Sequence, residues 1–304
     1  MEQAAAPLVD DRQVRRAFAR AAAGYDGAAF VAREVGGRMA ERLDYVRLEP
    51  ARILDLGCAT GADLAPLQAR YPQALTVGVD AVPAMLDQAR RQHPASGPLL
   101  SRLPAWLGGG SRGPALAGGE AARLPFAGGS FSLLWSNLML HWVNDPEPVL
   151  KELHRTLEVG GLLMFSTFGP DTLKELRAAF GDGYAHTQRF IDMHDWGDLL
   201  VHCSFADPVM DMEILTLTYP DFDALAAELK AAGDTVAMTA RRHGLMTPRL
   251  WRQAAAAFAA KARDGRVPVT LEVVYGHAWK TAPKKTADGR SIVRLDLPRP
   301  RRAE

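Results

Sequence analysis

Apolar residues recur along the chain with two periods, and each period predicts a different kind of secondary structure. In residues 10–48 they return every three or four positions, as at Val31 and Val35, which predicts helices. The next segment, ARILDLGC at 51–58, is a short and nearly continuous apolar run, which predicts a buried strand. LAPLQARY at 64–71 returns to the helical spacing. The chain therefore begins with helices and continues with a strand and another helix.

The same alternation extends over most of the remaining chain. Further strands are predicted at 74–80, 130–137, 162–168, 207–219 and 267–280. Further helices are predicted at 82–92, 145–161, 171–180, 193–205 and 221–262, the last with a break near 241–249. Asp171 is the expected N-cap of its helix. Residues 95–119 keep neither period and are rich in Gly, Pro and Ser, which predicts a long surface loop.

Apolar strands that alternate with helices are typical of a mostly parallel sheet covered on both faces, so the predicted fold class is α/β. The predicted organisation has an N-terminal helical segment at 1–48 and a main domain at 49–280. The main domain includes a helical insertion at about 221–262, before the last strand. A polar tail at 281–304 follows and is expected to be poorly ordered.

Composition narrows the classes of function. The 304 residues include 36 basic and 35 acidic side chains, and this balance argues against a general nucleic-acid-binding protein. Two cysteines, Cys58 and Cys203, make neither a disulfide framework nor a zinc pattern, and the eight histidines lack ligand spacing, so no metal is expected. No secretory signal or membrane-spanning stretch is found. A reduced, cytoplasmic setting is the expectation, and oligomeric state is not readable.

A glycine-rich loop follows the first predicted strand, in the sequence Asp55-Leu-Gly57-Cys-Ala-Thr-Gly61. A nucleotide-like ligand binds at this turn of a parallel sheet, and glycines let the backbone approach it closely. An acid beside the loop disfavours a pyrophosphate and suits a cationic ligand. Asp80 ends the second predicted strand, where an acid commonly holds two ribose hydroxyls. Ribose and positive charge without phosphate describe S-adenosylmethionine.

These segments resemble the motifs of the class I S-adenosylmethionine-dependent methyltransferases. ILDLGCATG is similar to that superfamily's first motif, VGVDAVPAML carries its ribose-binding acid, and GEAARLPF and FSLLWSN are similar to the two segments that follow. The resemblance implies a Rossmann-like sheet with an antiparallel C-terminal strand. Glu120 stands where the superfamily usually has Asp for the adenine amino group, and Ala122 where Glu is common. The implied cofactor-binding residues are Asp55, Gly57, Cys58, Gly61, Asp80, Ala81, Met85, Glu120, Ala121 and Asn137.

Most of residues 12–280 resemble the BioC family, the malonyl-[acyl-carrier-protein] O-methyltransferases of biotin synthesis. The resemblance rests on VRRAFARAAAGYD, on the long segment from WSNLMLHWVND to DTLKELR, on HTQRFIDMHDWGDLL and on TARRHGL. It implies that Tyr25 belongs to an N-terminal lid over the cofactor. It also implies methylation of the free carboxylate of a malonyl group on acyl-carrier protein, or on coenzyme A, to give a neutral ester that primes pimeloyl synthesis.

Several residues are candidates for contacting the methyl acceptor. His141 is the natural base candidate, with a half-buried structural histidine as the alternative, and a carboxylate acceptor needs no base because it is already ionised. Arg189 or Arg177 is a candidate for orienting the malonyl group. Candidates for docking an acidic carrier protein lie near the lid, in the insertion and in the predicted loop, and they are Arg15, Arg16, Arg20, Arg241, Arg242, His243, Arg249, Arg102, Trp106 and Arg112.

Three other functions stay open. The likeness extends to a mitochondrial complex I assembly factor that hydroxylates a protein arginine. The chain also fits a methyltransferase of another small carboxylate or a quinone precursor, and a non-catalytic protein that binds S-adenosylmethionine. The predicted cofactor residues are common to all of these proteins, so only the acceptor separates them.

Overall fold

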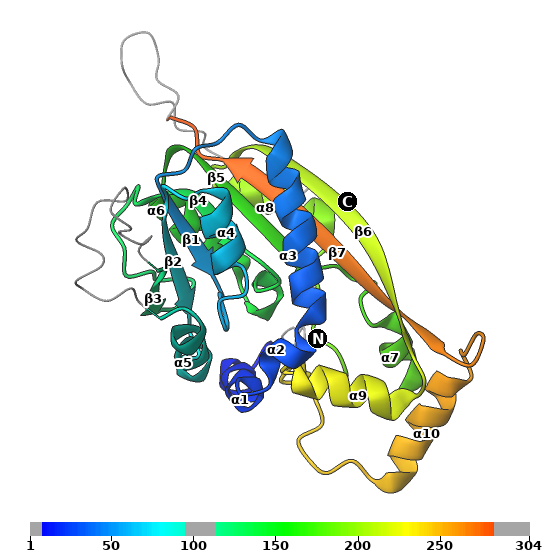
Figure 1. Ribbon diagram of the computed structural model, residues 1–304. Helices are drawn as coiled ribbons and strands as arrows, with labels where there is room; N and C mark the ends of the chain where they lie inside the picture. Colours follow the sequence, from blue (N-terminus) through cyan, green and yellow to red (C-terminus); the bar gives the residue numbers. More distant parts are fainter. Residues whose placement is uncertain (1–7, 95–112, 283–304) are drawn as a thin grey trace, which may run out of the picture.

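The computed structural model describes residues 8–94 and 113–282, and a seven-stranded sheet forms its centre (Figure 1). The strand order is β3-β2-β1-β4-β5-β7-β6. The strands are β1 (Arg52–Leu56), β2 (Leu75–Asp80), β3 (Ala115–Gly118), β4 (Phe131–Ser136), β5 (Leu157–Phe168), β6 (Ala206–Tyr219) and β7 (Val267–Trp279). Strands β1 to β5 pair in parallel, and β7 runs antiparallel between β5 and β6. The predicted α/β class, with an antiparallel C-terminal strand, is confirmed.

Helices cover both faces of this sheet. They are α1 (Asp11–Ala21), α2 (Tyr25–Ala28), α3 (Phe30–Arg42), α4 (Leu64–Arg70), α5 (Pro83–Gln92), α6 (Pro146–Thr156), α7 (Lys174–Ala179), α8 (Met193–His202), α9 (Phe222–Ala231) and α10 (Pro248–Ala259). Helices α3 and α4 pack on one face, and α6 and α8 pack on the other. No helix in the described ranges is long and apolar enough to cross a bilayer.

The strands bury alternate side chains in two separate cores. On β4, Leu134 joins the core under α6 and α8, whereas Leu133 and Trp135 join the core under α3 and α4. All three are almost completely buried. Burial of each such side chain contributes about 1.5–3 kcal/mol, and both faces need apolar residues, which explains the continuous apolar runs in the sequence.

Four predictions of local structure are wrong. Residues 232–240, predicted as helix, form none, because α9 ends at Ala231 and α10 begins only at Pro248. Part of the predicted loop 95–119 forms β3, which pairs with β2, while 95–112 lie outside the described residues. Residues 157–161 begin β5 and do not end a helix, because α6 stops at Thr156 and Gly160 takes a φ of 85° at an irregular part of the β4–β5 ladder. Asp171 does not cap α7; Leu173 precedes that helix with a φ of 57°. The predicted tail lies, from 283, outside the described residues.

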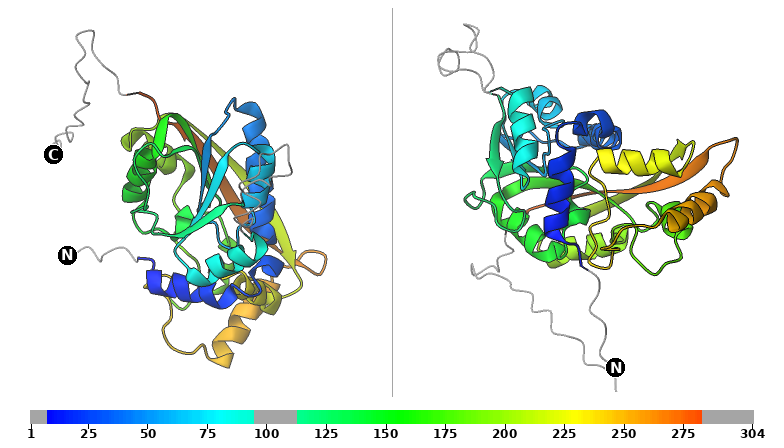
Figure 2. Two further views of the ribbon diagram at one scale, coloured as in Figure 1. Left: turned by 60° about the vertical axis from the view of Figure 1, so that its left-hand side comes forward. Right: turned by 90° about the horizontal axis from the view of Figure 1, so that it is seen from below.

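The N-terminal helices and the insertion lie side by side below the end of the sheet (Figure 2). Val9 and Met238 form an isolated antiparallel bridge, and the Asp10 N–H donates to the Ala237 carbonyl at 2.7 Å. Arg241 forms an ion pair with Asp10, the N-cap of α1, at 3.0 Å. Segments more than 220 residues apart in sequence therefore close the molecule over one end of the sheet.

Candidate active site

A cavity of about 690 Å³ lies between the sheet and these two segments. At one end it is lined by residues that follow β1, β2 and β4, including Gly57, Asp80 and Asn137. Its roof includes Val14 and Phe18 of α1. This is the edge at which open parallel sheets bind ligands, outside the carboxyl ends of the strands.

The loop after β1 is shaped by a close approach of its backbone to Met139. Gly57 has a φ of 76°, and a Cβ atom added there would lie 2.4 Å from Met139 Cγ. The Gly57 N–H donates to the Val79 carbonyl at 2.8 Å, which ties the loop to the end of β2. Only glycine meets both demands without strain, so this position keeps the loop flat against the cavity.

Asp80 presents a fixed carboxylate to the cavity from the end of β2. Its Oδ2 accepts a hydrogen bond from the Ala59 N–H at 2.9 Å, and its Oδ1 accepts one from the Val82 N–H at 2.8 Å. Burial raises the pKa of Asp80, whereas these backbone donors lower it. Each carboxylate oxygen can accept a second hydrogen bond, so Asp80 fits a pair of ribose hydroxyls.

The other acids near the loop make this end of the cavity unsuitable for phosphate. Burial raises the pKa of Asp55 well above its usual value, and the nearby Asp63 and Asp80 add to this increase. Asp55 is 2% exposed, and its Oδ2 has no hydrogen-bond partner among residues 8–94 and 113–282. Three carboxyl groups this close favour a cationic ligand. Only Asp80 of the three lines the cavity, so Asp55 and Asp63 act on a ligand from behind the wall, and together they suit the sulfonium and ammonium of S-adenosylmethionine better than a pyrophosphate.

Not every predicted cofactor residue reaches the cavity. Those that line it are Gly57, Asp80, Ala81, Met85, Glu120, Ala121 and Asn137. Asp55, Cys58 and Gly61 are not among the lining residues; Cys58 lies against Gly78 of β2, and Gly61 lies against His93. Burial raises the pKa of the Cys58 thiol well above its usual value, which keeps it protonated and disfavours nucleophilic chemistry.

A hydrogen-bonded network that the sequence did not indicate holds Asn137 at the cavity wall. Asp63 Oδ2 accepts from Trp135 Nε1 and from Asn137 Nδ2, each at 2.9 Å. Asn137 Oδ1 accepts from Ser166 Oγ at 2.8 Å. The network joins the glycine loop to β4 and β5. The sequence offered one signal, the acidic residue Asp63 two positions after Gly61. Its position in the sequence does not indicate which side chains it contacts.

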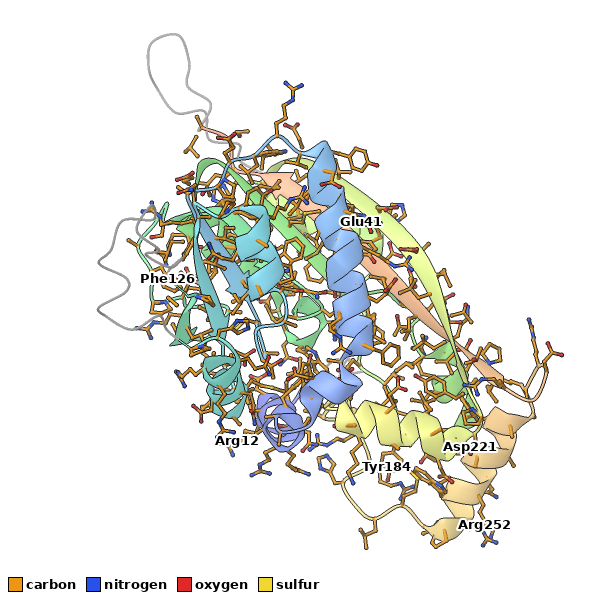
Figure 3. The ribbon with its side chains drawn as sticks, in the orientation of Figure 1. Arg12, Glu41, Phe126, Tyr184, Asp221 and Arg252 are labelled. Carbon is orange, nitrogen blue, oxygen red and sulfur yellow. The ribbon has the colours of Figure 1, made fainter. Side chains whose placement is uncertain are left out.

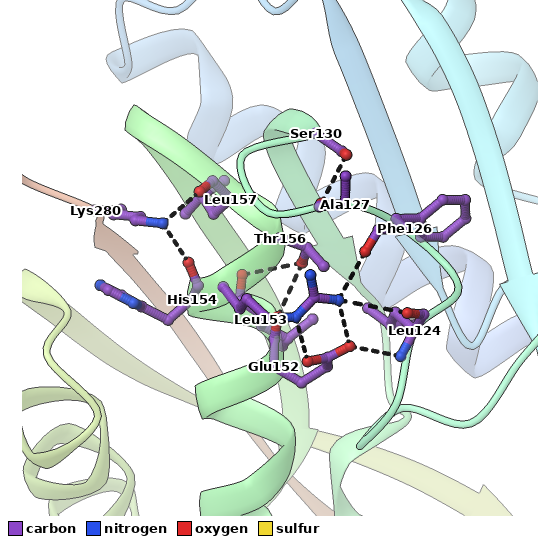
Figure 4. A network of polar contacts seen from close by, with 11 residues as sticks. Leu124, Phe126, Ala127, Ser130, Glu152, Leu153, His154, Thr156, Leu157 and Lys280 are labelled. Carbon is purple, nitrogen blue, oxygen red and sulfur yellow. Dashed lines mark hydrogen bonds and ion pairs between the residues drawn. The ribbon is translucent and has the colours of Figure 1, made fainter.

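Helix α6 fixes the segment that carries Glu120 and Ala121 (Figure 4). Glu152 Oε1 accepts from the Leu124 N–H at 2.6 Å, and Arg155 Nη2 donates to the Phe126 carbonyl at 2.8 Å. Glu152 also pairs with Arg155 at 2.7 Å. The segment at the edge of the cavity is thus anchored to a helix packed on the far face of the sheet.

The N-terminal helices contribute side chains to the cavity roof. Tyr25 lines the cavity, and its ring centroid lies 6.3 Å from that of Phe18. Burial raises the pKa of Tyr25, and Asp234 and Asp80 raise it further, so the phenol stays neutral. Arg15 forms an ion pair with Glu120 across the rim. Tyr25 and Glu120 therefore both line the cavity, and their roles toward a ligand stay predictions.

His141 lies deeper in the cavity wall and is uncharged. It is 6% exposed, and burial lowers its pKa to about 3. Its ring packs 5.0 Å from Phe168 and 5.1 Å from Trp142, centroid to centroid. Its Nδ1 is buried and finds no hydrogen-bond partner in the part of the chain that the structure describes. A neutral imidazole can donate one hydrogen bond from one nitrogen and accept with the other.

The far end of the cavity is mainly apolar, although His186, Gln188 and Glu228 also line it, and it is built by the insertion and the segments around β5. Its lining includes Phe168, Leu176, Phe180, Phe222, Leu225 and Trp251. Arg15 is the only arginine among the lining residues of the described chain, and these include no lysine. Arg189 is exposed and is not among the lining residues, which disfavours a role in orienting the methyl acceptor. Arg177, also outside the lining, donates to the Thr172 and Pro170 carbonyls.

Comparisons with known proteins agree with this geometry. Residues 54–165 match a family model described as a methyltransferase domain. The malonyl-[acyl-carrier protein] O-methyltransferase of Laribacter hongkongensis is 49% identical over 289 residues, which are 93% of this chain and 95% of that protein. The protein of the same name from Gallionella capsiferriformans is 46% identical over 95% of this chain and 98% of its own length. The chain belongs to the malonyl-[acyl-carrier protein] O-methyltransferase family.

Solved structures show the same fold at low sequence identity. The YcgJ protein of Bacillus subtilis has a TM-score of 0.53 and 14% identity, covering 81% of this chain and 99% of its own. The cyclase SpnF has a TM-score of 0.50 and 18% identity, covering 82% of this chain and 81% of its own. A cyclase on this fold illustrates that fold alone does not define a reaction. S-adenosylmethionine is the cofactor indicated by this family membership.

Proposed function

We propose that this chain transfers the methyl group of S-adenosylmethionine to the free carboxylate of a malonyl group carried by acyl-carrier protein. The observation that carries this proposal is the near full-length match to proteins of that name, in a chain whose cavity joins an acid-lined end to an apolar end. The neutral ester that results suits the priming of pimeloyl, and hence biotin, synthesis. A cytoplasmic location stays a prediction.

The residues at the acid-lined end would hold the cofactor. Asp80 would accept hydrogen bonds from the two ribose hydroxyls, and Gly57 would let the methionine portion lie against the backbone. Tyr25 and Phe18 would cover the ligand and exclude water, which prevents hydrolysis and strengthens the remaining polar contacts. When bound, the cofactor supplies an electrophilic methyl group on a sulfonium.

The acceptor side has to align a nucleophile that is already charged. A malonyl carboxylate is ionised at neutral pH, so no side chain needs to remove a proton. Its oxygen forms a bond to the methyl carbon while the carbon–sulfur bond breaks, and no proton moves. His141 is the group we propose to orient this carboxylate, as a neutral donor. A neutral donor holds the oxygen without the strong charge neutralisation that an arginine would impose.

Methyl transfer from labelled S-adenosylmethionine to malonyl-carrier protein tests this function. Malonyl-CoA and succinyl-carrier protein are the comparators, and mass spectrometry of the pantetheine arm locates the product. We expect the gain of one methyl on the malonyl group and its loss in Asp80→Ala. Bound cofactor without transfer to any of the three substrates would overturn the proposal in favour of another acceptor or a non-catalytic role.

A further inference from the structure

Helix α1 has two opposite faces with different surroundings. Its inner face holds Val14 and Phe18, which line the cavity, and Ala17 and Ala21, which are buried. Its outer face carries Arg12, Arg16 and Arg20 at intervals of four residues, and all three are exposed. Side chains at this spacing lie on one side of a helix. We call these three residues the α1 arginine row.

The α1 arginine row forms no ion pair with any residue of 8–94 and 113–282, although Asp11 precedes Arg12 on the same helix. Arg15, beside the row, pairs with Glu120. The whole chain has a net charge of only +1, so the row is a local concentration of positive charge. Figure 3 shows Arg12 beside α1 at the edge of the molecule.

The row lies close to the opening of the cavity. Several lining residues are also exposed and therefore mark the rim: Asp11 and Arg15 on α1, Glu120 and Ala122 across from them, and Asn144 and Asp145 before α6. Arg12 and Arg16 directly follow Asp11 and Arg15 in sequence. A helix with its side chains is about 10–12 Å across, so the row and the rim are separated by about one helix diameter.

Helix α1 is also firmly positioned, so its charges keep a defined arrangement. The Asp10 side chain caps the helix by accepting from the Gln13 N–H at 3.2 Å and also pairs with Arg241. Asn144 donates to the Val9 carbonyl at 2.9 Å. A rigid row of positive charges beside a cavity mouth suits a protein partner that presents a row of acids and delivers its cargo over the rim.

We propose that the α1 arginine row docks an acidic helix of the carrier protein that brings the acceptor to the cavity. This inference rests on the proposed function. An acidic carrier docked on the outer face of α1 starts its flexible arm one helix diameter from the opening. The carrier's charges meet Arg12, Arg16 and Arg20, while the thioester enters past Arg15 and Glu120. Such rim contacts chiefly speed association and weaken with added salt.

The test compares two substrates in one charge-reversed protein. Arg12→Glu/Arg16→Glu/Arg20→Glu is assayed with malonyl-carrier protein and with malonyl-pantetheine, which has the arm without the protein. We expect KM for malonyl-carrier protein to rise about tenfold or more, with kcat and the kinetics for malonyl-pantetheine within about twofold of the unaltered enzyme. Added salt should raise KM for the carrier substrate in the unaltered enzyme and not in the variant.

A control with the same charge change isolates position from net charge. Arg47→Glu/Lys261→Glu/Arg263→Glu reverses three other exposed basic residues, which form no ion pair in the described part of the chain. Its KM for malonyl-carrier protein should stay within about twofold. Equal losses in the two triple variants, or equal losses with the two substrates, would overturn the docking proposal.

Further measurements keep docking separate from folding and from the proposed function itself. Cofactor affinity and the thermal midpoint identify a misfolded variant, and Arg12→Gln/Arg16→Gln/Arg20→Gln is the milder alternative, with the same expected direction. If the unaltered enzyme methylates neither substrate, the proposed function fails. If it methylates both and the α1 variants leave the carrier-protein KM unchanged, only the docking proposal fails.

Discussion

The two ends of the cavity are built in different ways. The acid-lined end comes from short loops that follow β1, β2 and β4, and its key groups lie within a few residues of a strand end. The apolar end comes from α7, α9, α10 and the segment 185–190, which meet only in the folded chain. One end holds the Asp80 carboxylate and backbone donors, whereas the other is mainly apolar, with His186, Gln188 and Glu228 as polar members of its lining.

This contrast separates binding of the cofactor from choice of the acceptor. Polar contacts to a charged group are strong and depend on sub-ångström geometry, so the acid-lined end tolerates little change. The apolar end works by volume and exclusion of water, so substitutions there are expected to change stability and acceptor binding while leaving cofactor affinity intact. Each prediction below asks whether the two ends are as independent as this implies.

The largest effect is expected for Asp80→Ala at the acid-lined end. Loss of two hydrogen bonds to a carboxylate costs about 3–6 kcal/mol, which weakens cofactor binding at least about 100-fold. Isothermal titration calorimetry with S-adenosylmethionine measures it. Asp87→Ala removes a nearby exposed carboxylate on α5 and should bind normally. Normal affinity in Asp80→Ala would remove Asp80 from the cofactor site.

The next effect belongs to the apolar end. Phe222 is 3% exposed, and its ring packs against those of Trp251 and Phe258 at centroid distances of 4.7 and 5.7 Å. Phe222→Ala should lower the free energy of unfolding by about 3–5 kcal/mol, because it leaves a cavity. Urea titration measures this loss, with the exposed Phe30→Ala as control. Cofactor affinity, measured at low denaturant, should be unchanged. A loss of affinity comparable to the loss of stability would show that the two ends of the cavity are coupled.

A smaller and pH-dependent effect is expected for His141. The unfolded chain takes up a proton at this histidine near pH 6.5, whereas the folded chain does so only near 3. Between these values the unfolded state holds more protons, so stability falls as the pH drops from 6.5 toward 3. His141→Phe should reduce that slope by on the order of 1 kcal/mol per pH unit.

The slope is obtained from urea titrations at several pH values between 4 and 6.5. The matched control is His243→Phe, at an exposed histidine that forms no ion pair within the described residues, and it should leave the slope unaltered. An identical slope in His141→Phe and the unaltered protein would mean that the imidazole is charged in the fold, contrary to a neutral donor.

The smallest effect is expected for the exposed ion pair between Arg15 and Glu120 at the rim of the cavity. Arg15 and Glu120 are both substantially exposed, and exposed ion pairs contribute about 0–1 kcal/mol. Arg15→Gln should therefore shift the free energy of unfolding by less than about 1 kcal/mol and cofactor affinity by less than about fivefold. Thermal unfolding and calorimetry test both values. A loss beyond tenfold would show that Arg15 contacts a ligand directly.

The acid-lined end could be predicted from sequence because its chemistry is local. Gly57 and Asp80 follow apolar strands directly, and parallel strands bring their carboxyl ends to one edge. Asp63 was missed because its partners Trp135 and Asn137 lie more than 70 residues away. Short-range patterns carry no information about such pairs.

The apolar end was out of reach for a related reason. In the sequence, Phe180, Phe222 and Trp251 are indistinguishable from ordinary core residues. They line the cavity only because the segments around α7, α9 and α10 pack together in the fold. The structure also gives no support to the two arginines considered for orienting the acceptor. Arg189 lies outside the cavity lining, and Arg177 donates to the Thr172 and Pro170 carbonyls. Strand β3 was missed because four residues within a Gly- and Pro-rich stretch give no readable period.

The bridge between Val9 and Met238 has a consequence for how the chain acquires its structure. Helix α1 is synthesised well before the residues that hold its N-terminus, which come about 230 positions later. Contacts this distant in sequence form late, because closing such a loop costs entropy before any contact repays it. During synthesis the sheet can pair from β1 to β5 while the N-terminal segment stays undocked. A nascent chain stalled before residue 237 should therefore bind no acceptor and should expose α1 to proteases.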